Sequence, residues 1–235
     1  MAQTTIQQIF SNYMTKQPLF LNKSTLTTAY TPENVPHRDE QIAQLASILT
    51  PVLKKERPSN VFLYGPTGSG KTLVTLYVAS ELKNATKANG VPFHTVYVNC
   101  KMKRVADTEY RLLAHLSKLL GKDVPPTGLP TGQVYRTFYD ALDEREGVVI
   151  FIIDEIDALI KKVGDDLLYN FTRINQNQDV KNVKVAIIGI SNDVSFTEHI
   201  DARVRSSLSE EELIFPPYNA LQLSRILSEA AVRIL

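Results

Sequence analysis

The chain has 235 residues, of which 43% are hydrophobic and 22% are charged; these values suit a globular protein with one large α/β domain, or one domain and part of another. The 26 basic and 25 acidic side chains leave a formal net charge of +1, which excludes attraction to nucleic acid by the field of the whole protein and leaves only a local basic patch. The single cysteine excludes an internal disulfide and favours a reducing compartment, and no apolar run is long enough to span a bilayer.

The first 30 residues show no clear apolar period, and we expect them to form an N-terminal arm. Residues 30–38 contain two prolines and predict an extended lead-in. Apolar side chains then recur at helical spacing over residues 40–53. A short apolar run at 60–64 predicts a strand, which ends in a glycine-rich turn and is followed by a helical pattern over residues 71–82.

In the middle of the chain, strand patterns, in which apolar residues alternate, are interspersed with helical patterns. Residues 93–99 alternate as in a strand, and Cys100 after them is expected to be a small buried residue rather than a reactive thiol. Helices are predicted at 108–120 and 133–143, with a proline- and glycine-rich stretch between them. The uninterrupted run at 148–153 is rich in β-branched residues, as expected of a strand covered on both faces.

The last third predicts a helix at 167–177, a buried strand at 183–190, a short strand at 212–215 and a helix at 219–235. Strands that alternate with helices indicate an α/β fold. The expected architecture is a parallel five-stranded sheet with helices on both faces.

The strongest motif follows the first predicted strand. It matches the P-loop pattern at every position and consists of Gly65, Pro66, Thr67, Gly68, Ser69, Gly70, Lys71 and Thr72. The glycines let the backbone turn its N–H groups toward an anion, and the helix that follows adds its positive end. We therefore expect ATP or ADP here, with Lys71 at the β- and γ-phosphates and the Thr72 hydroxyl on Mg²⁺.

An acidic pair, Asp154 and Glu155, follows the run at 148–153. A Mg²⁺ site needs an acid at the end of a buried strand, and we expect this strand to lie beside the P-loop strand. Asp154 would then hold the metal through water, and Glu155 would orient or deprotonate the attacking water. Without a P-loop, such a pair is more often a solvated strand end. Asp157 is expected to be only a helix-start charge.

Polar and basic residues follow the strand at 183–190. Asn192 is a candidate for contact with the γ-phosphate or the catalytic water, although Asn also favours turns. Arg203 or Arg205 can stabilise transition-state charge at a neighbouring subunit. The alternative is that both arginines are solvated surface charges without a catalytic role, and the sequence leaves this open.

Five segments, taken in order, form a recognisable set: residues 36–40 (Pro-His-Arg-Asp-Glu), the P-loop, residues 153–157, residues 201–208 and residues 215–219. In this order they resemble the ATPase core of the archaeal Orc1/Cdc6 replication initiators, a family of AAA+ proteins. The resemblance runs from about Tyr30 to the end of the chain. The P-loop and the acidic pair are common to AAA+ proteins. The more specific pieces are the first and the last two segments and an insert after the second predicted strand.

The resemblance implies three parts: an arm over residues 1–30, an AAA+ core over residues 31–217, and the start of a helical lid over residues 218–235, truncated before the rest of the lid and a winged-helix domain. It places four residues around the adenine base: Pro36, His37, Arg38 and Tyr218. Many AAA+ proteins carry a Ser-Arg pair where this chain has Ser206-Ser207. Either Arg203 or Arg205 would therefore have to act in trans, or hydrolysis in trans does not occur.

Family members also carry a helical insert that meets DNA, and the resemblance places it within residues 101–132. Independently, residues 101–122 contain six Lys or Arg against two acids, an excess of four positive charges. Such a patch can contact several phosphates of duplex DNA. Charge alone leaves open a helical face that is balanced by acids elsewhere.

Together these features predict a cytoplasmic, nucleoid-associated replication initiator that binds double-stranded origin DNA and works as an ATP/ADP switch in helicase recruitment, with slow ATP hydrolysis. Its expected partners are origin DNA, a replicative helicase and other initiator subunits, with no membrane. The alternatives are a clamp-loader-like ATPase, which would need a Ser-Arg-Cys-like motif or pore-loop aromatics, and an AAA+ regulator that does not act at origins.

Overall fold

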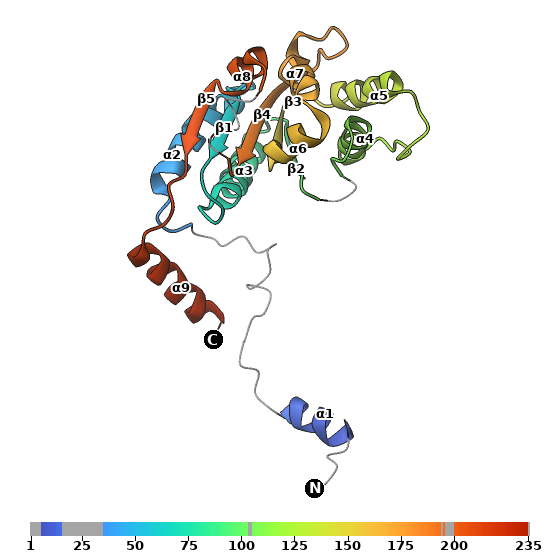
Figure 1. The fold of residues 1–235 in the computed structure, drawn as a ribbon. Coiled ribbons are helices and arrows are strands. Elements are labelled where there is room, and N and C mark those ends of the chain that lie inside the picture. Colours follow the sequence, from blue (N-terminus) through green and yellow to red (C-terminus); the bar gives the residue numbers. More distant parts are fainter. Residues whose placement is uncertain (1–5, 16–34, 103–104, 194, 196–199, 235) are drawn as a thin grey trace. The chain divides into compact units, whose positions relative to one another are not determined.

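The computed structural model describes residues 6–15, 35–102, 105–193, 195 and 200–234 (Figure 1). The chain divides into two compact units. One is Glu33–Pro217, and the other consists of Met1–Pro32 and Tyr218–Leu235. None of the helices within the described ranges is long and apolar enough to cross a membrane.

The larger unit is built on a sheet of five strands, all parallel, in the order β2-β3-β4-β1-β5. The strands are β1 (Val61–Tyr64), β2 (Phe93–Asn99), β3 (Gly147–Asp154), β4 (Val183–Ser191) and β5 (Glu211–Ile214). The predicted α/β class and each of the five predicted strands are confirmed, with bounds that agree to within one residue.

The expectation that the strand ending at Asp154 lies beside the P-loop strand is wrong. The central strand, β4, is hydrogen-bonded to both β1 and β3 and so separates them. Eight of its nine residues are buried, as expected of a strand that is covered on both faces of the sheet. The strands still finish together, because Tyr64 is in register with Ser191, and Asp154 with Ile190.

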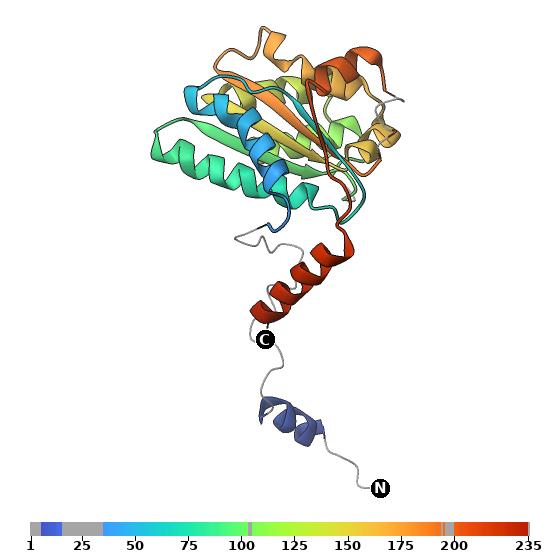
Figure 2. The same ribbon diagram turned by 90° about the vertical axis from the view of Figure 1, so that its left-hand side faces the viewer.

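One face of the sheet is covered by α2 (Asp39–Leu49), the 3₁₀ helix η2 (Thr50–Lys54) and α3 (Lys71–Ala88) (Figure 2). Leu45 and Val74 from these helices are completely buried. The single helix predicted over residues 40–53 is divided at Thr50. Pro51 follows directly, and its ring disfavours continued α-helix in the residue before it.

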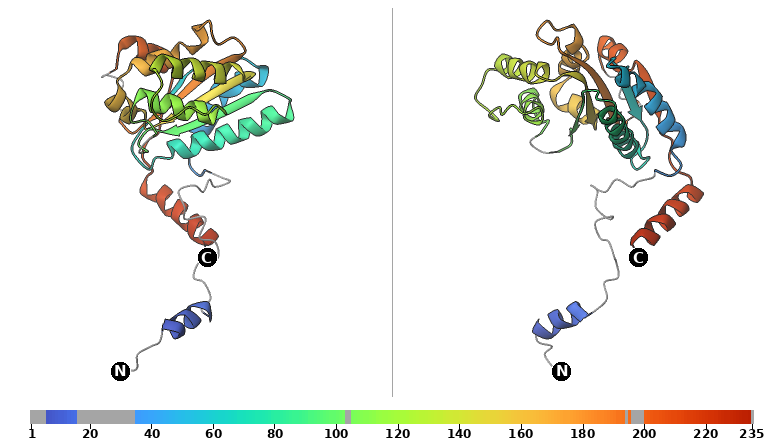
Figure 3. Two further views of the ribbon diagram at one scale, coloured as in Figure 1. Left: turned by 90° about the vertical axis from the view of Figure 1, so that its right-hand side faces the viewer. Right: turned by 180° about the vertical axis from the view of Figure 1, so that it is seen from behind.

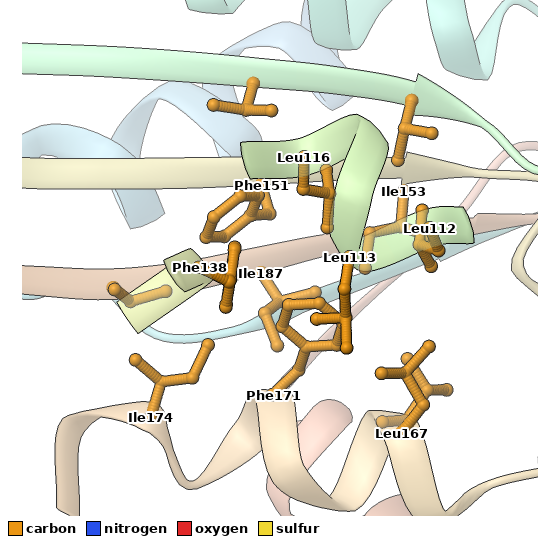
Figure 4. Packing of buried hydrophobic residues seen from close by; sticks show 14 of the residues in the cluster. Leu112, Leu113, Leu116, Phe138, Phe151, Ile153, Leu167, Phe171, Ile174 and Ile187 are labelled. Atoms are coloured by element: carbon orange, nitrogen blue, oxygen red, sulfur yellow. The ribbon is translucent and has the colours of Figure 1, made fainter. Parts of the chain in front are cut away.

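The opposite face carries α4 (Glu109–Leu119), α5 (Thr131–Asp143), α6 (Ile156–Val163), α7 (Asp166–Thr172), the 3₁₀ helix η3 (Ile174–Gln176) and α8 (Ala202–Leu208) (Figure 3). Its centre is aromatic. Phe138 of α5, Phe151 of β3 and Phe171 of α7 lie with ring centroids 5.6 to 5.9 Å apart (Figure 4). Each such pair adds about 1 kcal/mol to the free energy of unfolding beyond the burial of its surface.

Three helices among the described residues were not predicted. Two of them, α6 and α8, have eight and seven residues, too few to show a clear period. The third, α1 (Ile6–Thr15), corrects the expectation that the first 30 residues have no apolar pattern, because Ile6, Phe10 and Met14 recur at helical spacing. These three side chains are 66 to 84% exposed. In the C-terminal segment, α9 (Ala220–Ile234) agrees with the prediction.

Gly147, at the start of β3, offers a test of this packing. Its backbone has a φ of +82°, and a Cβ at this position would lie 2.1 Å from the carbonyl oxygen of Pro92. We expect Gly147→Ala to lower the free energy of unfolding by about 3 kcal/mol, through backbone strain and overlap together. Gly90→Ala is the control. Gly90 also has a positive φ, +64°, but a Cβ added there would meet no atom within 4 Å. Backbone strain alone should then lower the free energy of unfolding by about 1 kcal/mol. Urea unfolding checks both; equal losses would contradict the overlap.

Candidate nucleotide-binding site

The P-loop connects β1 to α3, and its glycines are needed for different reasons. Gly65, Gly68 and Gly70 all have positive φ angles. At Gly65 a Cβ would lie 2.2 Å from the carbonyl oxygen of Phe215, so the loop can pass this point only with glycine. Gly70 is the N-cap of α3 and provides no side-chain cap. The first N–H groups of α3 therefore have no capping side chain and are suited to an anion.

Lys71 begins α3 and is buried. Its Nζ donates to the carbonyl oxygens of Gly65 at 2.7 Å and Pro66 at 3.0 Å, and to Oδ1 of Asn192 at 2.8 Å. Burial lowers the pKa of Lys71, and the nearby carboxylates, Asp154 first, act in the opposite direction. The ammonium group is thus held by neutral oxygens at the mouth of the loop.

Asp154, at the end of β3, receives three hydrogen bonds. Its Oδ2 accepts from Oγ1 of Thr72 and from the hydroxyl of Tyr97, both at 2.9 Å. Its Oδ1 accepts from the backbone N–H of Glu155 at 2.9 Å. A hydroxyl and a carboxylate oxygen in contact form the kind of oxygen donor set that Mg²⁺ prefers, so the residues fit the expected cation.

Tyr97 was not predicted as part of the site. It lies on β2, whose alternating pattern was recognised, but that pattern does not reveal which strand lies next to it. Burial and the neighbouring Asp154 raise the pKa of Tyr97 to about 12. Its hydroxyl is therefore protonated at neutral pH and acts as a donor.

Glu155 has a left-handed backbone, with φ 57° and ψ 45°, which is uncommon outside glycine. Its carboxylate accepts from Nδ2 of Asn192 at 2.8 Å and pairs with Nζ of Lys101, also at 2.8 Å. Asn192 thus joins the P-loop lysine to the acidic pair through one amide. The structure brings together Lys71, Thr72, Asp154, Glu155 and Asn192.

The residues expected at the adenine base have different surroundings. Arg38 is 3% exposed, and its guanidinium donates to the carbonyl oxygens of Ser69 at 2.9 Å and Pro216 at 2.6 Å, so it supports the P-loop backbone. His37 has a φ of 60°, and its buried Nε2 has no hydrogen-bond partner in the described structure, so this nitrogen could serve a ligand. Pro36 is half-buried. Tyr218 belongs to the other unit, and its role stays a prediction.

The two candidate arginines lie on α8. Arg203 is 68% exposed and pairs with Asp201 at 2.9 Å, and its guanidinium lies 5.1 Å from the ring centroid of Tyr169. Arg205 is exposed. Within the described ranges, neither arginine hydrogen-bonds to the residues gathered around Lys71, and the role in trans stays a prediction.

Asp157 is more than the predicted helix-start charge. It lies in the first turn of α6, as expected, but it is also buried, and its Oδ1 accepts from Oγ of Ser191 at 3.0 Å. It therefore ties α6 to the end of β4. The prediction was incomplete because burial depends on contacts that are distant in sequence.

The basic excess in the region 101–132 is partly neutralised. Lys101 pairs with Glu155, and Lys122 with Glu144 at 2.5 Å, and both acids lie outside the region. Arg111 pairs with Asp107 at 3.5 Å, an acid already counted against the excess. Two further basic residues of this region, Lys103 and Arg104, lie outside the described residues. A pocket of about 300 Å³ between α4 and the following loop has a mixed lining, with Arg111 and Lys118 beside the acid Asp123 and the apolar side chains of Ala114 and Val124.

Cys100 is completely buried just beyond β2, as predicted. Burial raises the pKa of its thiol to about 12. Because the thiolate is the reactive form, this residue has a packing role.

A protein-family model described as an AAA domain matches residues 54–194, which is more than half of the chain. The chain belongs to the AAA domain family. The AAA domain implies a site for nucleotide, in agreement with the P-loop at residues 65–72, within the matched range.

Relatives of this AAA domain include ORC1-type DNA replication protein 1 of Methanosarcina mazei, which is 50% identical over 227 residues. The match covers 97% of this chain and 53% of that protein. The solved structure of the Aeropyrum pernix ORC1 protein in complex with DNA has a TM-score of 0.83 and 40% identity, covering 92% of this chain and 54% of that chain. The chain thus spans about half the length of these relatives. The predicted resemblance to Orc1/Cdc6 initiators is confirmed by these identities.

A more distant structure shows the fold alone. The Aeropyrum pernix ORC2 protein, solved as ADPNP–ADP complexes, has a TM-score of 0.77 at 21% identity, covering 93% of this chain and 57% of that chain.

Proposed function

We propose that the chain is the ATP-binding module of a DNA replication initiator, which binds origin DNA and changes state between ATP and ADP. One observation carries the nucleotide part of this proposal: the amide of Asn192 joins Lys71 to Glu155. A single contact network thus includes the lysine expected at the phosphates and the glutamate expected at the attacking water.

The residues of this network would divide the work as follows. The backbone of residues 65–70 and Lys71 would hold the phosphates of ATP or ADP, and Thr72 with Asp154 would hold Mg²⁺, which neutralises phosphate charge. Glu155 would orient or deprotonate water, and Asn192 would keep its carboxylate in place. Slow ATP hydrolysis would then end the ATP-bound state.

The proposed DNA contact is supported by the relatives and by Lys118, an exposed lysine of α4 at the rim of this pocket. Basic side chains there would bind phosphates of duplex DNA without reading its sequence. The other proposed partners are a replicative helicase and further initiator subunits, and the proposed location is the cytoplasm, on the nucleoid. Pro36 and His37 are proposed at the adenine base, and Arg203 or Arg205 in trans.

The proposal is tested by the anisotropy of a labelled duplex, measured with Mg²⁺-ATP and with Mg²⁺-ADP. We expect nucleotide-sensitive binding that weakens about fivefold or more in Lys118→Glu, because each lost phosphate contact weakens binding. Lys54→Glu is the matched control, since it reverses an exposed charge in η2 on the other face of the sheet. Nucleotide binding without any DNA binding at modest salt would favour the AAA+ regulator instead.

A further inference from the structure

Tyr97 brings the outer strand of the sheet into the proposed metal site. It lies on β2, in register with Ile152 of β3, and Asn99 at the end of β2 is in register with Asp154. The Tyr97 hydroxyl donates to Oδ2 of Asp154 at 2.9 Å. The edge strand therefore supplies a direct contact to the acid that ends its neighbour.

The hydrogen bonds to Asp154 fill its two oxygens unequally. An ionised carboxylate has about four acceptor directions, two on each oxygen. Oδ2 uses both of its own, for Thr72 and Tyr97, whereas Oδ1 uses one, for the N–H of Glu155. The remaining direction is on Oδ1, where a water from the shell of a hydrated cation can donate.

We propose that Tyr97 is a positioning residue for Asp154. Its hydroxyl keeps Oδ2 occupied and turned toward Thr72, so that Oδ1 receives the hydrated Mg²⁺. Without the hydroxyl, Oδ2 gains an empty acceptor direction, and the carboxylate is held only by Thr72 and by the N–H of Glu155. This inference rests on the proposed nucleotide site and adds to it a residue from outside the P-loop and the acidic pair.

The test compares Tyr97→Phe with wild type and with Tyr110→Phe. The control removes a similar bond far from the acids, from the Tyr110 hydroxyl to the carbonyl oxygen of Pro125 at 2.8 Å. The affinity for a fluorescent ATP analogue is measured in EDTA and over a series of Mg²⁺ concentrations. We expect Tyr97→Phe to raise the Mg²⁺ concentration at half-maximal effect about tenfold, the usual scale for losing a partner of a metal-holding group.

The same variant should bind the analogue in EDTA as wild type does, and Tyr110→Phe should match wild type in both conditions. An unchanged Mg²⁺ dependence in Tyr97→Phe would overturn the inference, and so would an equal loss of affinity in EDTA, which would indicate a structural role. Wild-type protein that does not bind the analogue would overturn the nucleotide site, and this inference with it. The three outcomes are distinct in one titration.

Discussion

Replacing Lys71 with alanine is expected to weaken binding of ATP by about 100-fold or more, because a charge-assisted contact to phosphate is among the strongest that a side chain can make. Its Nζ donates hydrogen bonds to the carbonyl oxygens of Gly65 and Pro66 and to Oδ1 of Asn192. Loss of the side chain would remove the positive charge and also leave these oxygens without their donor. A fluorescent ATP analogue in Mg²⁺ measures the affinity directly.

Two comparisons separate the loss of charge from a loss of structure. Lys161→Ala removes an exposed lysine of α6 that pairs with Asp157 at 3.8 Å, and it should bind nucleotide as wild type does. Urea unfolding without nucleotide should show that Lys71→Ala remains folded. Retained tight binding in a folded Lys71→Ala protein would refute the phosphate-site assignment.

Replacing Glu155 with glutamine is expected to retain nucleotide binding and to reduce phosphate release by about 100-fold, on the scale of a lost general base. The amide keeps an oxygen that can accept from Asn192 or Lys101, the two donors that now hold Glu155. It lacks the negative charge that orients or deprotonates water. Binding and phosphate release are measured on the same preparation.

Glu144→Gln is the matched control for this variant. Glu144 is also a glutamate paired with a lysine, Lys122, but it lies on the surface. Phosphate release should be the same as in wild type. A Glu155→Gln protein that releases phosphate within about twofold of wild type would remove Glu155 from the hydrolytic role.

The pattern of apolar residues predicts the strands of this fold well, because each strand has its own local period and its own flanking turns. It also explains why the P-loop, Asp154 and Asn192 come together, since the carboxyl ends of parallel strands meet at one edge of the sheet. The order of the strands in the sheet was harder to predict. The segments that form β3 and β4 are both largely apolar, and this pattern does not indicate which strand lies next to which.

Other features depend on contacts between residues far apart in sequence. The hydroxyl of Tyr97 meets Asp154 across 57 positions, and the guanidinium of Arg38 meets the carbonyl of Pro216 across 178. A periodic pattern contains no information on such pairs. The burial of Arg38 was therefore unexpected, although the resemblance had placed this residue near the nucleotide.

The position of β4 sets the width of the site. With β4 between them, the ends of β1 and β3 are two strand spacings apart, roughly 10 Å, whereas neighbouring strands would be about 5 Å apart. This spacing places Asn192, which follows β4, between the loop after β1 and the acidic pair after β3, and its amide spans the distance from Lys71 to Glu155. Backbone hydrogen bonds of the sheet, rather than side chains, define the spacing of the strand ends. Substitutions at Lys71, Asp154 or Asn192 therefore change the lining of the site while its width stays constant.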